Sequence, residues 1–251
     1  MEQLTIEQER EILLAILNDK IDDCDNGSSR VVFLELGENT TAVLNRLHIP
    51  TNCVIKVNIG SAGCTQSHQE RELFWRAFED GRENLFATIY AYGKVIQIME
   101  KLECNSFLED VYYCCDSEDD HYYRPIHFYD RIDQIIKTKY RIEKDETLVT
   151  FDSFYEQYMR LTENMVTFLQ DISDYTGASG DDYQVGFDSN GLIKSYDYGF
   201  TRQGSRKTHC FSGDYDSIAC NVDYYIEEIL HLDFISPDEL EEIAQEMSWN
   251  D

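Results

Sequence analysis

The spacing of apolar residues changes along this chain, and the change limits the folds that the chain can adopt. Short apolar runs at Val31–Leu36, Cys53–Val57, Leu85–Tyr90 and Lys94–Met99 are typical of strands. Farther on, apolar residues recur every three or four positions, as in a long core helix: Phe154, Tyr158, Leu161, Met165, Phe168, Leu169 and Ile172. Strands gathered in the first half and helices in the second predict an α+β fold.

Two local patterns predict how the chain begins. Thr5 and Gln8 have the spacing of a capping box, so we expect a helix to start there. The runs Val31–Leu36 and Thr40–Leu44 flank Gly37, and we expect them to pair as a hairpin with glycine at the bend.

A lysine, Lys56, interrupts the apolar run Cys53–Val57. A buried ammonium without a partner is costly, so a buried Lys56 requires an acidic side chain nearby. Glu70 lies on the apolar face of a helix predicted over residues 66–79 and is the first candidate, with Glu72 as the alternative. If Lys56 instead lies at the edge of a sheet, its head group can reach water and needs no partner.

With these features the chain resembles the first half of a protein kinase. Lys56 looks like the strand lysine of that family, Glu70 like the glutamate that pairs with it, and Gly37–Val43 like a reduced glycine-rich loop. The segment Ile96–Leu102 resembles the strand and hinge that receive adenine. The resemblance implies five nucleotide-binding residues: Gly37, Lys56, Glu70, Glu100 and Leu102.

The second half continues this resemblance. A turn signal, Ser189-Asn190-Gly191, joins two strand-like runs and predicts a hairpin. The hairpin ends in Asp197-Tyr198-Gly199, which is similar to the Asp-Phe-Gly motif whose aspartate holds a metal ion in kinases. The resemblance therefore implies ATP and Mg²⁺ as cofactors, with Asp197 and Gln184 as metal ligands.

The kinase resemblance also implies a two-lobed arrangement. Residues 1–102 would form an N-terminal helix and a small antiparallel sheet with one main helix, ending in the hinge. Residues 103–251 would form a mostly helical lobe, with an exposed acidic insertion over Cys114–His121 and acidic C-terminal helices.

The catalytic loop departs from the kinase pattern. Counting back from the hairpin places Ser179 where the family has its catalytic aspartate, and Gln184 where it has a metal-binding asparagine. A serine hydroxyl cannot act as a carboxylate base, so we expect a pseudokinase that acts by binding a protein partner. The alternative is an active, atypical Ser/Thr protein kinase in which Asp181 or Asp182 replaces the missing base.

The net charge of −28 limits the partners of this chain. Residues 208–251 hold twelve Asp and Glu and no Lys or Arg, and such a surface repels nucleic acid. We therefore expect no direct nucleic-acid binding, and a protein partner that is basic or itself binds nucleic acid. A small acidic chain of this kind resembles phage and mobile-element inhibitors of host or defence proteins. A further alternative is an acidic mimic of DNA or RNA.

The sequence favours a cytoplasmic location. Its apolar runs are shorter than a membrane span, and the acidic N-terminus is unlike a signal peptide, so we expect no membrane association. The eight cysteines include no CxxC pair, which favours free thiols over a zinc site or structural disulfides.

Overall fold

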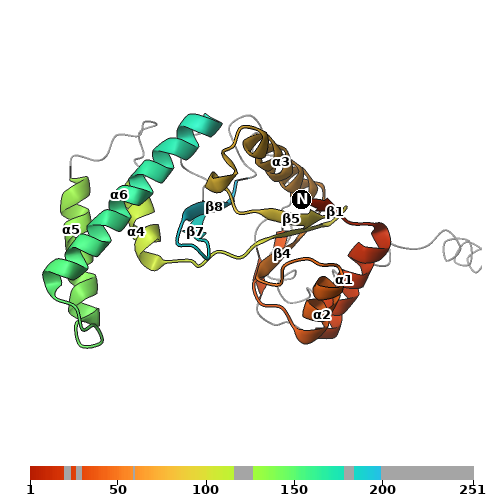
Figure 1. Cartoon of the computed structure of the whole chain (residues 1–251), viewed down its shortest axis with the longest axis horizontal. Helices are drawn as coiled ribbons and strands as arrows, with labels where there is room; N and C mark the ends of the chain where they lie inside the picture. Colours follow the sequence, from red (N-terminus) through yellow and green to blue (C-terminus); the bar gives the residue numbers. More distant parts are fainter. Residues whose placement is uncertain (20–23, 27–29, 59, 116–126, 178–183, 199–251) are drawn as a thin grey trace, which may run out of the picture. The chain divides into compact units, whose positions relative to one another are not determined.

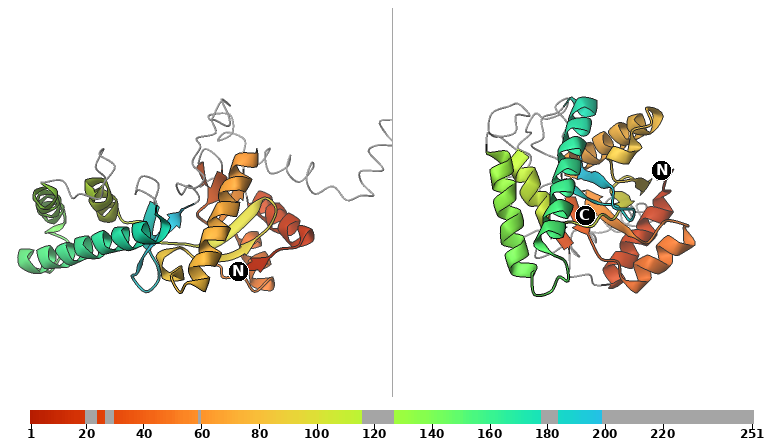
Figure 2. Two further views of the ribbon diagram at one scale, coloured as in Figure 1. Left: turned by 90° about the horizontal axis from the view of Figure 1, so that it is seen from above. Right: turned by 60° about the vertical axis from the view of Figure 1, so that its left-hand side comes forward.

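The computed structural model of this chain describes residues 1–19, 24–26, 30–58, 60–115, 127–177 and 184–198 (Figures 1 and 2). These residues divide into two compact units. The first unit contains Met1–Ser67 and Ile89–Glu100. The second contains His68–Thr88 and the described residues from Lys101 to Tyr198.

The first unit is built on a six-stranded sheet. Its strands are β1 (Glu2–Gln3), β2 (Cys24–Asn26), β3 (Arg30–Phe33), β4 (Cys53–Asn58), β5 (Ile89–Tyr92) and β6 (Ile96–Glu100). They lie in the order β1-β5-β6-β4-β3-β2, and every neighbouring pair is antiparallel except β1 with β5. The strands predicted around Cys53–Val57 and Lys94–Met99 are thereby confirmed as β4 and β6.

Two helices, α1 (Ile6–Asp19) and α2 (Glu38–Arg46), lie side by side and bury the apolar face of this sheet (Figure 1). Along a strand, alternate side chains point to opposite faces, so every second residue joins the core. The core holds Ile12, Leu13, Ile16 and Leu44 from the helices, and Val31, Phe33, Ile55, Val57, Ile96 and Ile98 from the strands. The predicted capping box is confirmed, since Thr5 and Gln8 each accept the other's backbone N–H.

A buried carboxylate fastens α1 to the turn between β5 and β6. Glu9 is almost fully buried, and its two oxygens accept the backbone N–H groups of Lys94, Val95 and Ile96 at 2.7–2.9 Å. The carboxylate fits against Gly93, where a Cβ atom would collide with it. Three N–H donors replace the water that the charge loses on burial.

The hairpin predicted over Val31–Leu44 is wrong, because Thr40–Leu44 lies in the helix α2. Thr40 and Leu44 are one helical turn apart and both are buried. The helix begins after Gly37, where the Asp19 carboxylate accepts the N–H groups of Asn39 and Thr40 at 2.8 Å. The sheet therefore carries a helix that the expectation of one main helix did not include.

The second unit is mostly helical. It contains α3 (Gly60–Glu79) from His68 onward, a short 3₁₀ helix (Glu83–Leu85), α4 (Ser106–Cys115), α5 (Phe128–Glu143) and α6 (Phe151–Thr176), followed by the hairpin β7 (Gln184–Phe187) and β8 (Ile193–Asp197). The helix predicted over residues 66–79 and the hairpin around Ser189-Asn190-Gly191 are both confirmed.

Helices α4, α5 and α6 pack against one another (Figures 1 and 2), and aromatic side chains join α6 to each of the other two. The ring centroids of Tyr158 in α6 and Phe107 in α4 are 4.6 Å apart, and those of Phe154 in α6 and Tyr140 in α5 are 5.1 Å apart. The long helix predicted around these positions is confirmed as α6, which directly follows the cap residue Thr150.

Two predictions for the second half concern the acidic insertion and the C-terminal helices. Cys114 does not open an exposed insertion, because it is a buried residue near the end of α4. Residues 116–121 of that insertion, and the C-terminal helices, lie outside the described residues. Thus the described part of the chain is a mixed α+β structure, and no helix within it has the length and apolar character needed to cross a membrane.

Candidate functional site

Lys56 lies on β4, a central strand of the first unit, and only 3% of it is exposed. It stands opposite Val32 of β3 and Gln97 of β6. Its neighbours in β4, Ile55 and Val57, belong to the apolar core, so Lys56 points to the other face of the sheet. The possibility that Lys56 lies at a sheet edge and reaches water is therefore wrong.

The face of the sheet that carries Lys56 is polar although it is buried. Arg30 stands opposite Asn58, and the register puts both side chains on the same face as Lys56 and Gln97. Asn58 accepts a hydrogen bond of 2.6 Å from the Ser67 hydroxyl of α3. Cationic and amide side chains that are buried in this way require hydrogen-bonding or charged groups around them.

Sequence reasoning missed Arg30, Asn58 and Gln97. A signal for Asn58 was present, because it follows Lys56 by two residues in the same strand and so shares its face. Arg30 and Gln97 join the row only through strand register, which the sequence of either strand does not specify.

Gly37 and Glu100 lie at different places in the first unit. Gly37 precedes α2, and the N–H groups beyond it already bind the Asp19 carboxylate. Burial tends to raise the pKa of Asp19, but hydrogen bonds from Thr40 and Asn39 outweigh it and lower this pKa. Glu100 ends β6 opposite Cys53, and burial together with the Glu100 charge raises the pKa of Tyr90 to about 12.

The second unit brings three of the predicted residues into one small region. Gln184 and Asp197 stand directly opposite each other where β7 begins and β8 ends. Leu102 packs on the same hairpin at Gly186, where an added Cβ would lie 2.8 Å from the Leu102 Cβ. The contact is fixed by two backbone hydrogen bonds of 2.8 and 2.9 Å between Glu103 and Phe187.

Tyr198 of the Asp-Tyr-Gly motif is an anchor of the second unit. It is almost fully buried, its ring lies 4.7 Å from Phe86, and its hydroxyl donates to the Ala87 carbonyl at 3.0 Å. The Ala87 N–H donates in turn to the Ser195 carbonyl at 2.7 Å. These bonds fix the backbone on both sides of Asp197.

The turn of the hairpin is held by Asp188. Its carboxylate accepts the N–H groups of Asn190 and Leu192 at 2.8 and 2.9 Å, and the Lys194 ammonium lies 3.3 Å away. Burial tends to raise the pKa of Asp188, but these hydrogen bonds and the Lys194 charge lower it. Gly191 completes the turn with a φ of 78°, a conformation that favours glycine.

The remaining predicted site residues are Glu70, Asp181 and Asp182. Glu70 lies on α3 and is completely buried. Asp181 and Asp182, the candidate catalytic residues, lie outside the described residues. Within the described ranges, His, Cys, Asp and Glu form no cluster of three that could hold a metal ion. Asp197 and Gln184 offer two oxygen ligands, and Mg²⁺ commonly takes its other ligands from water and phosphate.

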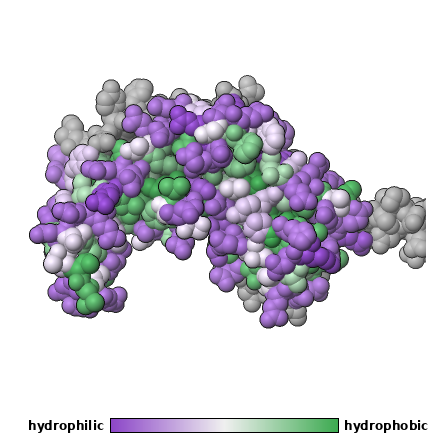
Figure 3. All heavy atoms as spheres, viewed as in Figure 1, coloured by the Kyte–Doolittle hydropathy of each residue, from purple (hydrophilic) through white to green (hydrophobic). Residues whose placement is uncertain are grey.

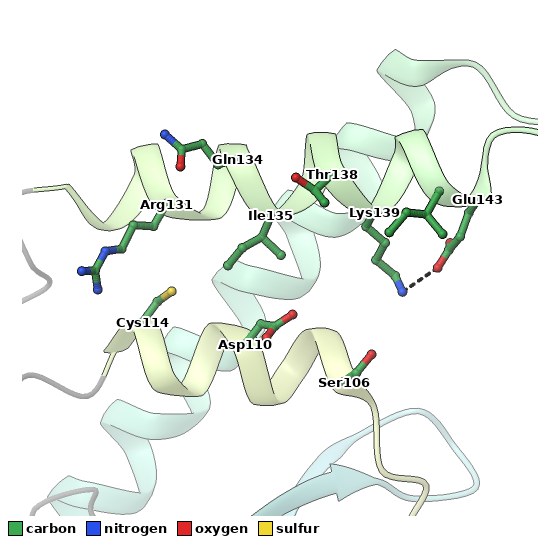
Figure 4. A pocket seen from close by; sticks show the side chains of 10 residues that line it. Ser106, Asp110, Cys114, Arg131, Gln134, Ile135, Thr138, Lys139 and Glu143 are labelled. Carbon is green, nitrogen blue, oxygen red and sulfur yellow. Dashed lines mark ion pairs between the residues drawn. The ribbon is translucent and has the colours of Figure 1, made fainter.

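A separate hollow of about 760 Å³ lies between α4 and α5 (Figure 4). Its walls carry Ser106, Asp110 and Cys114 from α4, and Arg131, Gln134, Ile135, Thr138, Lys139, Ile142 and Glu143 from α5. Lys139 and Glu143 form an ion pair of 2.6 Å in its wall, and burial raises the pKa of the Cys114 thiol. None of the predicted catalytic, nucleotide-binding or metal-binding residues lies in this wall.

Comparison of the chain with models of protein families, with curated proteins and with solved structures gave no match.

Proposed function

We propose that this chain is a kinase-like protein that binds ATP and Mg²⁺, lacks ordinary phosphotransfer, and acts by binding a protein partner. The support from the first unit is a buried lysine, Lys56, on the central strand that directly precedes α3. Kinases carry their phosphate-binding lysine on a strand, and its partner glutamate on the following helix. Glu70 stands at the place of that glutamate on α3, and it is buried as well.

The observation that carries the proposal is the register of β7 and β8. It sets the carboxylate-bearing Asp197 opposite Gln184, at the positions where the kinase resemblance expects the two metal ligands. A carboxylate and an amide supply the oxygen ligands that Mg²⁺ prefers. The buried Tyr198 and the Asp188 turn hold this pair on a fixed scaffold.

Loss of phosphotransfer follows from the sequence around this pair. Ser179 replaces the aspartate that would orient the attacking hydroxyl, and serine cannot take that role at neutral pH. Nucleotide binding does not depend on that aspartate, because lysine and the metal ion contact the phosphates by themselves. The protein would then act as a nucleotide-dependent binding module, in the manner of a phage or mobile-element inhibitor.

Thermal unfolding with and without ATP and Mg²⁺ tests the nucleotide site. We expect a rise in Tm of about 5–10 °C when ATP exceeds its dissociation constant about a hundredfold. The rise should disappear in Lys56→Ala and in Asp197→Asn. Asp197→Asn is the safer variant, since Lys56 is buried and its loss can disturb folding.

Two exposed residues provide matched controls. Lys137→Ala and Asp174→Asn each remove a charge of the same sign at an exposed position of the second unit, and both should keep the full rise in Tm. An unchanged Tm at millimolar ATP in the unsubstituted protein would overturn the nucleotide site. Transfer of the γ-phosphate to a protein substrate, abolished in Asp197→Asn, would favour the active Ser/Thr kinase instead.

The net charge of −28 supports a second candidate, a mimic of DNA or RNA. Attraction between a polyanion and a basic cleft is ionic and weakens steeply with salt. Under this alternative, DNA would displace the protein from a nucleic-acid-binding partner, and ATP would have no effect.

A further inference from the structure

Helix α3 exposes two large aromatic side chains in the second unit. Trp75 is 51% exposed and Phe78 is 57% exposed. Their rings are stacked, with centroids 6.0 Å apart and an angle of 27° between the planes. A surface that offers a Trp and a Phe together is the kind of patch in which binding energy concentrates at protein interfaces.

The exposed aromatic pair sits on a firmly held helix. The opposite face of α3 buries Leu73, Phe74 and Ala77. After the helix ends, Gly81 takes a left-handed conformation with a φ of 66°, and the Arg82 N–H bonds back to the Ala77 carbonyl at 2.7 Å. The rings are thus presented in a fixed position, which lowers the entropy cost of binding.

Carboxylates rim one side of the Trp75 ring. The Trp75 indole N–H donates to Glu79 at 3.1 Å, which holds that carboxylate beside the ring. Glu72, three residues before Trp75, is exposed on the same side of the helix, and so is Arg76, which follows Trp75 directly. Arg71 lies on the side of Phe78. An aromatic face next to two carboxylates matches one side chain best, because a guanidinium both stacks on a ring and pairs with carboxylate oxygens.

We propose that an arginine of a protein partner docks on the Trp75–Phe78 face of α3, stacks on Trp75 and pairs with Glu79. This inference deepens the proposed function, since it assigns the surface through which a partner binds. The net charge of −28 draws cationic partners toward the chain, and the α3 face gives them a specific place to bind. Lysine lacks the planar group that stacks, so the surface discriminates between the two basic residues.

The test uses two short peptides of equal length and charge, one of alternating Arg and Gly and one of alternating Lys and Gly. Calorimetry at physiological ionic strength gives both dissociation constants. We expect the Arg peptide to bind about threefold tighter. The preference should vanish in the double variant Trp75→Ala, Phe78→Ala and should weaken in Glu79→Gln, while the affinity for the Lys peptide stays the same.

Tyr129→Ala is the matched control, because Tyr129 is an exposed aromatic residue on a different helix, α5. It should keep the preference for Arg. An equal affinity of the unsubstituted protein for both peptides, or a preference that survives the double variant, would overturn the inference. A protein that sediments as a dimer, and as a monomer once Trp75 and Phe78 are replaced, would show that a second copy covers this face and would overturn it too.

The same variants separate this inference from the nucleotide site. The double variant should keep the rise in Tm with ATP and Mg²⁺, because Trp75 and Phe78 lie outside the proposed ligand set. If the unsubstituted protein shows no preference for the Arg peptide but keeps the ATP effect, the arginine site on α3 is wrong and the nucleotide site stands. If the unsubstituted protein prefers the Arg peptide but its Tm does not rise with ATP and Mg²⁺, the nucleotide site is wrong and the arginine site stands.

Discussion

Asp19 closes the N-terminus of a helix that begins almost twenty residues later in the chain. The residue just before α2 is Gly37, which has no side chain to serve as a cap. Asp19 supplies the missing acceptor by binding the N–H groups of Asn39 and Thr40. A carboxylate at this end also interacts favourably with the helix dipole.

Replacement of Asp19 by alanine should lower the free energy of unfolding by about 1 kcal/mol near neutral pH, the usual cost of a lost helix cap. The folded protein lowers the pKa of Asp19 below its ordinary value of 3.8. The contribution is therefore complete above that value and is lost as the pH falls through the lower, folded pKa. Urea unfolding of both proteins at about pH 7 and about pH 3 measures the difference.

Asn18→Ala is the control for this substitution, since Asn18 is exposed in the same turn of α1. It should change stability little at either pH. An effect of Asp19→Ala that is equally large in acid would show that the charge of the cap is unimportant.

At the level of single residues, the sequence revealed an unusual residue more readily than the residues that contact it in the folded protein. Lys56 could be found because a charge within an apolar run requires an explanation. Arg30 and Gln97 could not, because each joins Lys56 only through the register of a neighbouring strand. The role of Asp19 could not be found either, because its partners Asn39 and Thr40 follow it by about twenty residues.

The hairpin β7–β8 is the element that gathers most of the predicted site. Its close contact with the segment after β6 depends on Gly186, which leaves room for Leu102 and for the Glu103 carbonyl. A side chain at Gly186 would collide with the backbone of Glu103. Backbone atoms cannot move aside as easily as the end of a flexible side chain.

Gly186→Ala should separate the hairpin from the Leu102 segment at a cost of about 1–3 kcal/mol. A new Cβ would lie 3.0 Å from the Glu103 carbonyl oxygen. Hydrogen exchange of the Glu103 and Phe187 amides should become faster, because these two residues bond to each other. Ser189→Ala, an exposed change in the same hairpin, should leave both rates unchanged, and equal rates in the two variants would contradict this account.

At the level of elements, local sequence patterns predicted a helix or strand correctly where long-range contacts favour the same structure. The turn signal at Ser189-Asn190-Gly191 and the period of α6 each identify an element without outside help. The run Thr40–Leu44 is apolar enough for a strand, and its helical form follows from contacts with Asp19 and the core. Helix α5 was missed although Phe128, Ile132 and Ile136 recur every four residues on its buried face.

Over the whole molecule, charge is the dominant property. Figure 3 shows hydrophilic side chains over most of the visible face, with apolar groups among them in several places, one of which is the turn between α5 and α6. The exposed residues there are Ile142, Leu148 and Val149. With a net charge of −28, the chain is destabilised by repulsion among its own acidic groups.

Added NaCl should therefore raise the Tm. Raising ionic strength from about 0.1 to about 1 M shortens the range of charge interactions from about 10 to about 3 Å. The gain should be largest near neutral pH and should shrink toward the pI of about 4.4, where the net charge approaches zero. A Tm that falls with salt at neutral pH would show that specific ion pairs outweigh the general repulsion.

The hydrogen bonds between Glu9 and the β5–β6 turn can form only late in the synthesis of the first unit. Its donors follow Glu9 by 85 to 87 residues, so α1 leaves the ribosome long before they exist. At usual rates of synthesis this interval is about 4–17 s. During it, a carboxylate that will be buried remains in water, and α1 lacks the strands β5 and β6. The sheet of the first unit thus cannot be complete before residue 100 has been synthesised, and the bonds that hold α1 to the β5–β6 turn form only after that.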